Sequence, residues 1–166
     1  VDYRRAHLGL VGEKHLLAYC TGPQHTQAAA ADLANSLKKR LPGPDVTPRQ
    51  LRERSWWQGL EVFVVVDDLD LVNNRSGSPL APLVDFLPQG RDLGLHLIVA
   101  RRTGGASRAM YEPLLQTLSD MAVPALLFSG DRMEGRLANG VAPRRLPPGR
   151  ALLARRGLPV EQVQAP

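Results

Sequence analysis

Two adjacent carboxylates, Asp67 and Asp68, offer the clearest chemistry in this sequence. They follow an apolar run from Val62 to Val66 that is typical of a strand buried on both faces of a parallel sheet. Acidic groups at the carboxyl end of such a strand lie where open α/β sheets bind ligands. One aspartate there can hold Mg²⁺ through its water shell, and the next acidic residue can orient an attacking water for phosphoryl transfer. The alternative is a buried strand that ends in a solvated acidic turn.

A second apolar run, from Leu95 to Ala100, ends in the cationic pair Arg101-Arg102. Because this strand comes next in the chain, we expect it to pair beside the first, with its exit facing the same crevice. The two arginines can contact a phosphate or sense its loss, or they can neutralise the carboxylates in a structural ion cluster. Arg91 lies on the turn before this strand, at the end away from the crevice, where it can reach a neighbouring subunit's site in a ring.

Helical and extended segments alternate along the rest of the chain, which predicts βαβ units and a mostly parallel sheet covered by helices. We expect the end of a strand at 1–5, helices at 23–40, 48–57 and 79–87, strands at 62–67, 95–100 and 125–128, a helix that starts at Ser107, and a terminal hairpin of 151–154 and 160–163. The polar loop 73–78 is expected to be exposed and mobile. No linker divides the chain, so 1–166 is interpreted as a single domain.

Local patterns refine the helices. Ala29, Leu33 and Leu37 recur at four-residue intervals and predict the buried face of the first helix. Thr47 and Ser107 are expected as N-caps. The tryptophans at 56 and 57 are expected to pack the second helix onto the sheet, or one of them is an exposed anchor for a partner.

The bulk composition is that of a globular protein, with 166 residues, 43% hydrophobic and 22% charged. The net charge of +5 comes almost entirely from arginine, and we do not interpret it as a nucleic-acid footprint. Cys20 is the only cysteine, which excludes a disulfide framework and indicates a reducing cytosol. No apolar run approaches the ~20 residues of a membrane-spanning helix. Because the chain starts at Val1 in strand-like sequence, we expect it to be part of a longer polypeptide.

Several longer stretches resemble the FtsK/SpoIIIE group of hexameric motor ATPases. These stretches are 62–68, 90–102 and 129–132. DNA-pumping members end the second stretch in Ala-Thr-Gln, where this chain has Ala100-Arg101-Arg102. A closer resemblance is to the last ATPase domain of the EccC motors of actinobacterial type VII (ESX) secretion, carried by 1–5, 51–57, 100–108 and the tail at 147–150.

The resemblance implies a RecA-like P-loop NTPase sheet that uses ATP and Mg²⁺ in a ring, a homo-hexamer in the parent complex. It implies a place on the cytoplasmic, inner face of the cell membrane, with the membrane reached through other parts of the complex. The partners would be other ATPase domains of the motor and secreted helical-hairpin proteins of the WXG class, not nucleic acid. By position, Asp67 would be the Mg²⁺-associated Walker B aspartate, and Asp68 stands where active motors usually have glutamate. Arg91 would serve the neighbouring subunit's nucleotide, and Arg101, with Arg102 beside it, would be the sensor.

Two departures from the family pattern limit the expected activity. The sequence has no Gly-x-x-x-x-Gly-Lys-Ser/Thr loop, so we expect the domain to be incomplete at its N-terminus and hydrolysis by this chain alone to be absent. Asp68 is one methylene shorter than glutamate, and a misplacement of ~1 Å can lower a rate ~100-fold. These departures favour a regulatory domain with weak hydrolysis. The alternatives are a DNA-translocating motor domain and a degenerate, purely structural ring domain.

Overall fold

The structure, a computed structural model, describes residues 1–74 and 77–165, which fall into two compact units, Val1–Arg101 and Arg102–Pro166. Both combine helices with strands, so the α/β class is confirmed. The expectation of a single domain over 1–166 stays a prediction. Of the loop predicted to be mobile, Arg75 and Ser76 lie outside the described residues.

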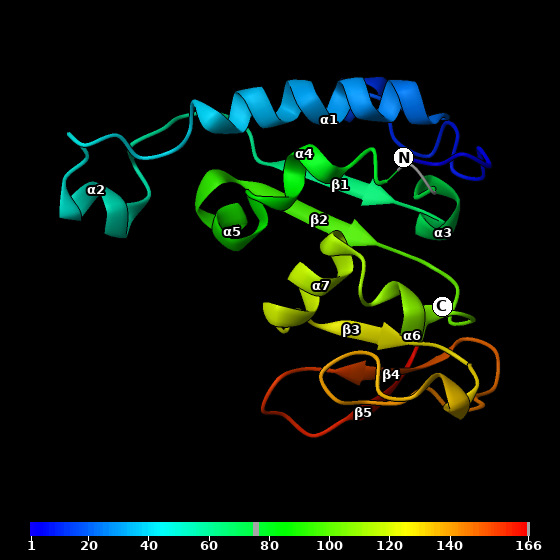
Figure 1. Ribbon diagram of the computed structural model, residues 1–166. Coiled ribbons are helices and arrows are strands. Elements are labelled where there is room, and N and C mark those ends of the chain that lie inside the picture. Colours follow the sequence, from blue (N-terminus) through cyan, green and yellow to red (C-terminus); the bar gives the residue numbers. More distant parts are fainter. Residues whose placement is uncertain (75–76, 166) are drawn as a thin grey trace. The chain divides into compact units, whose positions relative to one another are not determined.

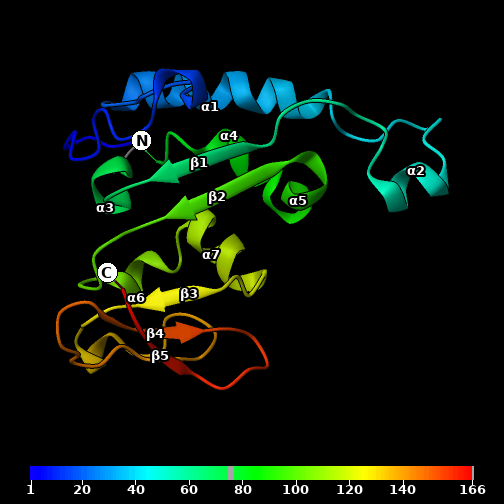
Figure 2. The same ribbon diagram turned by 180° about the vertical axis from the view of Figure 1, so that it is seen from behind.

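The first unit is built on two parallel strands with helices around them (Figure 1). Its elements are α1 (Pro23–Lys38), α2 (Pro48–Glu53), β1 (Val62–Val66), α3 (Leu69–Val72), α4 (Ala81–Val84), α5 (Gly90–Leu93) and β2 (Leu95–Val99). The strands pair in parallel from Val62 opposite Leu95 to Val66 opposite Val99, as the sequence predicts. Helices α1 and α4 contact each other, and α1 lies above β1 in both views (Figures 1 and 2).

Helix α1 matches its predicted range, but its buried face is shifted. The fully buried positions are Thr26, Ala30, Ala34 and Leu37. Ala29 and Leu33, which were expected on this face, are only half-buried on its flank. The small side chains of Thr26, Ala30 and Ala34 allow the helix to approach its neighbours closely along this face.

The second helix is shorter than predicted. Thr47 is its N-cap, as expected, and forms a capping box with Gln50. The helix ends at Glu53 because Arg54 adopts a left-handed conformation (φ 51°, ψ 40°). The two tryptophans therefore lie in the connection that follows and not on the helix.

Both tryptophans fasten that connection to the rest of the first unit. Trp56 Nε1 donates to the Arg40 carbonyl oxygen at 2.7 Å, and Trp57 Nε1 donates to the Asp92 carbonyl oxygen at 2.8 Å. The Arg40 guanidinium lies 4.3 Å from the Trp57 ring centroid, a cation–π contact. Gly94, at φ +68°, passes so close to the Trp57 ring that a Cβ there would lie 2.6 Å from Cη2. The expectation that the tryptophans have a packing role is thus supported. They pack from the connection after α2, however, and not from the helix itself.

Two further helix predictions are wrong in detail. The segment 79–87 forms only α4, and Pro88 lies in a separate 3-10 turn, Leu87–Gln89. Ser107 is not an N-cap, because α6 (Ala106–Ala109) starts after Gly105 and a second helix, α7 (Pro113–Asp120), carries the leucines. The two helices separate because a residue before proline avoids the helical region, and Glu112 is extended (φ −71°, ψ 139°).

The expectation that β1 is buried on both faces is also wrong for the described residues. Alternate side chains of a strand point to opposite faces. Val66 is fully buried, whereas Phe63 is 61% exposed, Val65 51% and Ile98 on β2 54%. Val62, Val64 and Val66 are buried or half-buried and Phe63 and Val65 are exposed, so an apolar run alone cannot show how many faces of a strand are covered.

The second unit contains an antiparallel sheet and two short helices. Besides α6 and α7, its elements are β3 (Ala125–Leu127), a 3-10 turn (Arg132–Glu134), β4 (Arg150–Ala154) and β5 (Glu161–Gln164). The sheet order is β3-β4-β5, and β4 and β5 form the terminal hairpin within one residue of its predicted limits. A cluster of Ala106, Leu127, Leu137 and Leu152 forms its core.

The first residues form a loop and not the end of a strand, which corrects the prediction for 1–5. Only the first two residues bond to neighbouring chain segments as a strand would: Val1 N donates to the Val65 carbonyl oxygen at 2.7 Å, the Val1 carbonyl accepts from Asp67 N at 3.0 Å, and Asp2 N donates to the Cys20 carbonyl oxygen at 2.9 Å. Asp2 is buried, and its carboxylate accepts from Tyr19 Oη at 2.6 Å and from His7 N at 2.8 Å. The loop is therefore folded around one carboxylate. Among the described residues, no helix has both the length and the apolarity to cross a membrane.

The close approach at Gly94 gives a stability test. We expect Gly94→Ala to lower the free energy of unfolding by about 2–4 kcal/mol. The backbone strain of a left-handed alanine and the packing cost of displacing the Trp57 ring both contribute to this loss. Gly9 is the matched control, since it also has positive φ (+81°) but no atom within 4 Å of the place that a Cβ would take. Gly9→Ala should lower stability by only about 1 kcal/mol. Urea unfolding measures both, and equal losses would contradict the contact with Trp57.

The buried carboxylate of Asp2 gives a pH test. The hydrogen bond from Tyr19, partly opposed by burial and assisted by the His7 backbone, lowers the pKa of Asp2 to about 2. A carboxyl whose pKa is lower in the folded state stabilises the fold above its unfolded pKa, and this contribution is lost as pH falls toward 2. We expect thermal unfolding of Asp2→Asn to depend less on pH between about 4 and 2 than that of the wild type. Parallel pH profiles for the two proteins would show that Asp2 is not held in this way.

Candidate functional site

The carboxylates lie at the carboxyl ends of β1 and β2, where the sequence predicts them. Beyond the last strand pair, Ala100 N donates to the Val66 carbonyl oxygen at 2.8 Å, and Leu69 N donates to the Ala100 carbonyl oxygen at 2.9 Å. These two bonds fix the chain on both sides of Asp67 and Asp68. The edge of the parallel pair therefore presents both side chains from a rigid frame.

Asp68 has a strained backbone. It adopts the left-handed conformation (φ 47°, ψ 55°) at the start of α3, which aspartate tolerates better than most residues. Its amide donates to Asp67 Oδ1 at 2.9 Å, so the two residues form a tight local turn. This geometry explains how adjacent residues of one chain can both direct their carboxylates to the same edge.

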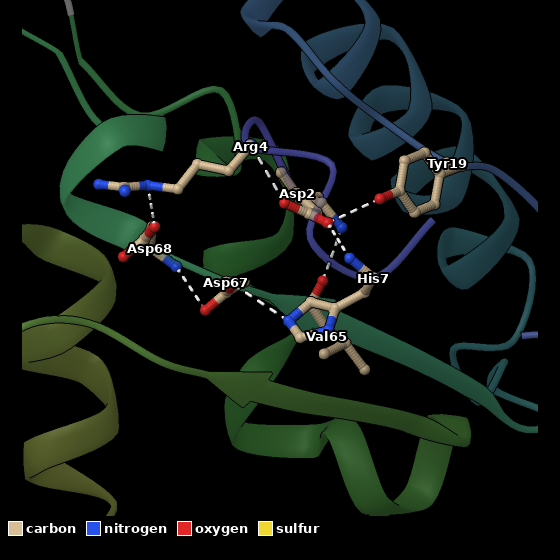
Figure 3. A network of polar contacts seen from close by, with 8 residues as sticks. Asp2, Arg4, His7, Tyr19, Val65, Asp67 and Asp68 are labelled. Atoms are coloured by element: carbon tan, nitrogen blue, oxygen red, sulfur yellow. Dashed lines mark hydrogen bonds and ion pairs between the residues drawn. The ribbon is translucent and has the colours of Figure 1, made fainter. Parts of the chain in front are cut away.

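Two side chains of the N-terminal loop contact the carboxylates (Figure 3). His7 Nε2 donates to Asp67 Oδ2 at 3.1 Å, since a carboxylate can only accept. Arg4 Nε lies 2.5 Å from Asp68 Oδ2. The same loop is anchored by Asp2, which accepts from the Arg4 and His7 amides. The buried Asp2 carboxylate thus positions a guanidinium and an imidazole against the two partly exposed carboxylates of Asp67 and Asp68.

The pair remains open to solvent, with side-chain exposures of 29% for Asp67 and 21% for Asp68. In residues 1–74 and 77–165, no group of three or more His, Cys, Asp or Glu side chains is placed to hold a metal ion. A Mg²⁺ ion bound with phosphates needs only one or two carboxylates, because it keeps several waters. Asp67, at the strand end with an accessible carboxylate, fits that requirement.

Of the three arginines predicted for the site, the structure does not bring all to the carboxyl edge of β1 and β2. Arg101 follows Ala100 directly and lies at the same end of β2. Arg102 begins the second unit. Arg91 is exposed on α5, before β2 and hence at the opposite end of the strands, as expected. The roles of Asp67, Asp68, Arg91, Arg101 and Arg102 remain proposals.

Arg4 and His7 were not predicted as parts of this site. The sequence shows a basic pair after Asp2, but a contact between residues about sixty positions apart has no spacing that reveals it. The sequence offered one indication, the strand end expected at 1–5, and the structure places Val1 beside the strand that carries Asp67.

Comparison with known proteins identifies relatives across nearly the whole chain. No protein-family model matches. The ESX-4 secretion system protein EccC4 of Mycobacterium tuberculosis is 48% identical over 153 residues, which are 92% of this chain and 12% of the relative. The chain thus spans about an eighth of that relative's length.

Two solved structures are also similar. The cytoplasmic domain of the type VII secretion ATPase EccC of Thermomonospora curvata superimposes with a TM-score of 0.94 at 44% identity, covering 99% of this chain and 19% of that one. ATPases 2 and 3 of the same protein, solved in complex with a signal sequence peptide, give a TM-score of 0.93 at 43% identity over 99% of this chain and 29% of that one. The resemblance drawn from the sequence motifs is therefore confirmed: the chain is homologous to the ATPase domains of the EccC proteins of ESX secretion systems.

Proposed function

We propose that this chain is part of an ATP- and Mg²⁺-binding domain of a type VII secretion translocase, with a regulatory role and slow hydrolysis. The observation that carries the proposal is the position of Asp67 and Asp68 at the carboxyl edge of a parallel strand pair, in a chain 48% identical to an ESX secretion protein. In this role Asp67 holds the Mg²⁺ ion through water, and Arg101 and Arg102 face the phosphates. Mg²⁺ would neutralise charge on the phosphates when bound.

The proposed partners follow from the relatives. A related pair of EccC ATPase domains has been solved with a signal sequence peptide, which supports recognition of secreted WXG-class hairpin proteins by the domain family. The proposed assembly is a homo-hexameric ring at the cytoplasmic face of the membrane, reached through other parts of the complex. In such a ring, Arg91 reaches the nucleotide of the neighbouring subunit.

The proposal of slow hydrolysis rests on the side chain and the backbone of Asp68. Its carboxylate is one methylene shorter than that of glutamate, and Arg4 Nε lies 2.5 Å from it, so the ion pair competes with any water that the carboxylate would orient. Its left-handed backbone also favours aspartate over longer side chains. These features support a site that binds nucleotide more effectively than it turns it over.

The Mg²⁺ role of Asp67 is tested by calorimetry on the full-length protein. We expect Asp67→Asn to weaken ATP binding at least about tenfold in the presence of Mg²⁺, because the amide lacks the charge that orients the water shell of the ion. Binding of ATP in EDTA should change little. The control is Asp85→Asn, a carboxylate on the turn after α4. If both variants bind Mg–ATP like the wild type, the nucleotide site does not involve Asp67.

The role of Asp68 is tested by lengthening it. We expect Asp68→Glu to raise the steady-state ATP turnover of the full-length protein by about tenfold, because the added methylene brings the carboxylate closer to the attacking water. Asp68→Asn, which keeps the length but cannot act as a base, should not exceed wild-type turnover. Turnover that falls in Asp68→Glu while Mg–ATP binding is retained would rule out Asp68 as the limiting group.

The role of Arg91 is tested in the assembled protein. Its guanidinium makes no hydrogen bond or ion pair with any residue the structure describes, so Arg91→Ala should leave thermal stability within about 0.5 kcal/mol of the wild type. We expect it to lower turnover about tenfold or more at concentrations where the ring forms. Arg52→Ala, an exposed arginine on α2, is the control. Equal turnover in the two variants would remove Arg91 from the proposed site.

A further inference from the structure

The positive charge of the second unit is concentrated near its end. Residues 129–165 contain seven arginines and three acidic side chains. All three acidic side chains are engaged: Asp131 accepts from Met133 N at 2.8 Å, Glu134 accepts from Gly105 N at 2.7 Å, and Glu161 pairs with Arg155. Most of the arginines in this segment therefore have no carboxylate within it to neutralise them.

A cavity of about 510 Å³ opens among these arginines. Arg132, Arg136 and Arg144 stand at its rim, whereas Pro143 and Leu152 are buried in its floor and Val160 lines one wall. We call these six residues the arginine groove. Its volume lies within the range of about 300–1,000 Å³ that ligand sites in proteins occupy.

The groove is held open by a tight turn. Val141 N donates to the Ala138 carbonyl oxygen at 2.9 Å, which closes the turn beside the floor. Asn139 takes the left-handed conformation within it (φ 48°), and its Nδ2 donates to the carbonyl oxygens of Val123 and Ala154 at 2.9 and 3.1 Å. The turn is thus tied to the connection before β3 and to the last residue of β4, which forms the groove before any ligand binds.

The rim cations are available for a ligand. Arg144 Nη2 donates to Gln162 Oε1 at 3.1 Å, a neutral partner that orients the guanidinium without neutralising it. The side chains of Arg132 and Arg136 form no hydrogen bond or ion pair with any residue of 1–74 or 77–165. Three uncompensated cations thus surround a floor of buried apolar side chains.

We propose that the arginine groove binds an acidic polypeptide segment, with an aliphatic side chain on the floor and flanking carboxylates on the arginines. Forked guanidinium groups match carboxylates in geometry and charge. Nucleic acid fits less well, because single strands bind on aromatic platforms and no aromatic side chain is among the described residues that line the groove. The apolar floor also offers no contact to a phosphodiester chain. None of the residues of this groove belongs to the proposed nucleotide site, and the proposal does not depend on the function proposed for that site.

The test is fluorescence anisotropy of a fluorescein-labelled peptide with one leucine between pairs of glutamates, titrated with the full-length protein. We expect the double variant Arg132→Glu/Arg136→Glu to weaken binding at least about tenfold, because two attractive contacts become repulsive. Val160→Asp should also weaken binding, by about fivefold. A peptide with serine in place of leucine should bind the wild type more weakly than the original.

The charge-matched control is Arg145→Glu/Arg156→Glu, which reverses two exposed arginines that do not line the groove. It should change peptide affinity by less than about twofold. Circular dichroism checks folding, and Arg132→Gln/Arg136→Gln replaces the charge reversal if that variant unfolds. Equal losses in the two charge-reversed proteins would overturn the proposal in favour of a diffuse charge effect. Displacement of the peptide by inorganic phosphate at constant ionic strength, or loss of duplex DNA binding with the peptide unaffected, would overturn it too.

Discussion

The parallel pairing of β1 with β2 is the constraint on which the candidate site depends. Its register places Val66 opposite Val99, so both strands end at one edge and the carboxylates emerge there. The bonds through Ala100 extend this frame to the first turn of α3. At the other end of the strands, the close contact of Gly94 with Trp57 fixes where β2 begins. A slip of one residue would turn every side chain of the strand to the other face and remove the carboxylates from the edge.

The N-terminal loop adds a second level of control. Asp2 holds the loop through Tyr19 and the backbone, and the loop in turn places Arg4 and His7 on the two carboxylates. In the proposed site, a Mg–nucleotide complex would have to compete with these contacts. Surface ion pairs contribute only about 0–1 kcal/mol each, so the competition is weak enough for a bound nucleotide to displace them. The arrangement fits a domain in which binding, more than turnover, is the useful event.

The sequence predicted the parts of the fold that local patterns determine. The range of α1, the parallel strands and the hairpin of β4 and β5 follow from apolar periodicity and turn residues. The wrong predictions have different origins. The split of α6 from α7 follows from the local effect of Pro113 on Glu112, whereas the apolar pattern does not reveal the early end of α2 at a left-handed Arg54 or the exposure of Phe63. Likewise, the sequence located Asp67 and Asp68 but not their partners, because Arg4 and His7 reach them only through the folding of a loop around Asp2.

The most direct test of the account is a crystal structure of the full-length protein with Mg²⁺ and a non-hydrolysable ATP analogue. The account predicts that the Asp67 carboxylate leaves His7 and accepts from a water bound to Mg²⁺, with the analogue's phosphates at the carboxyl edge of β1 and β2. A nucleotide bound elsewhere, or bound here with the hydrogen bond between His7 and Asp67 intact and no ion near that carboxylate, would contradict it.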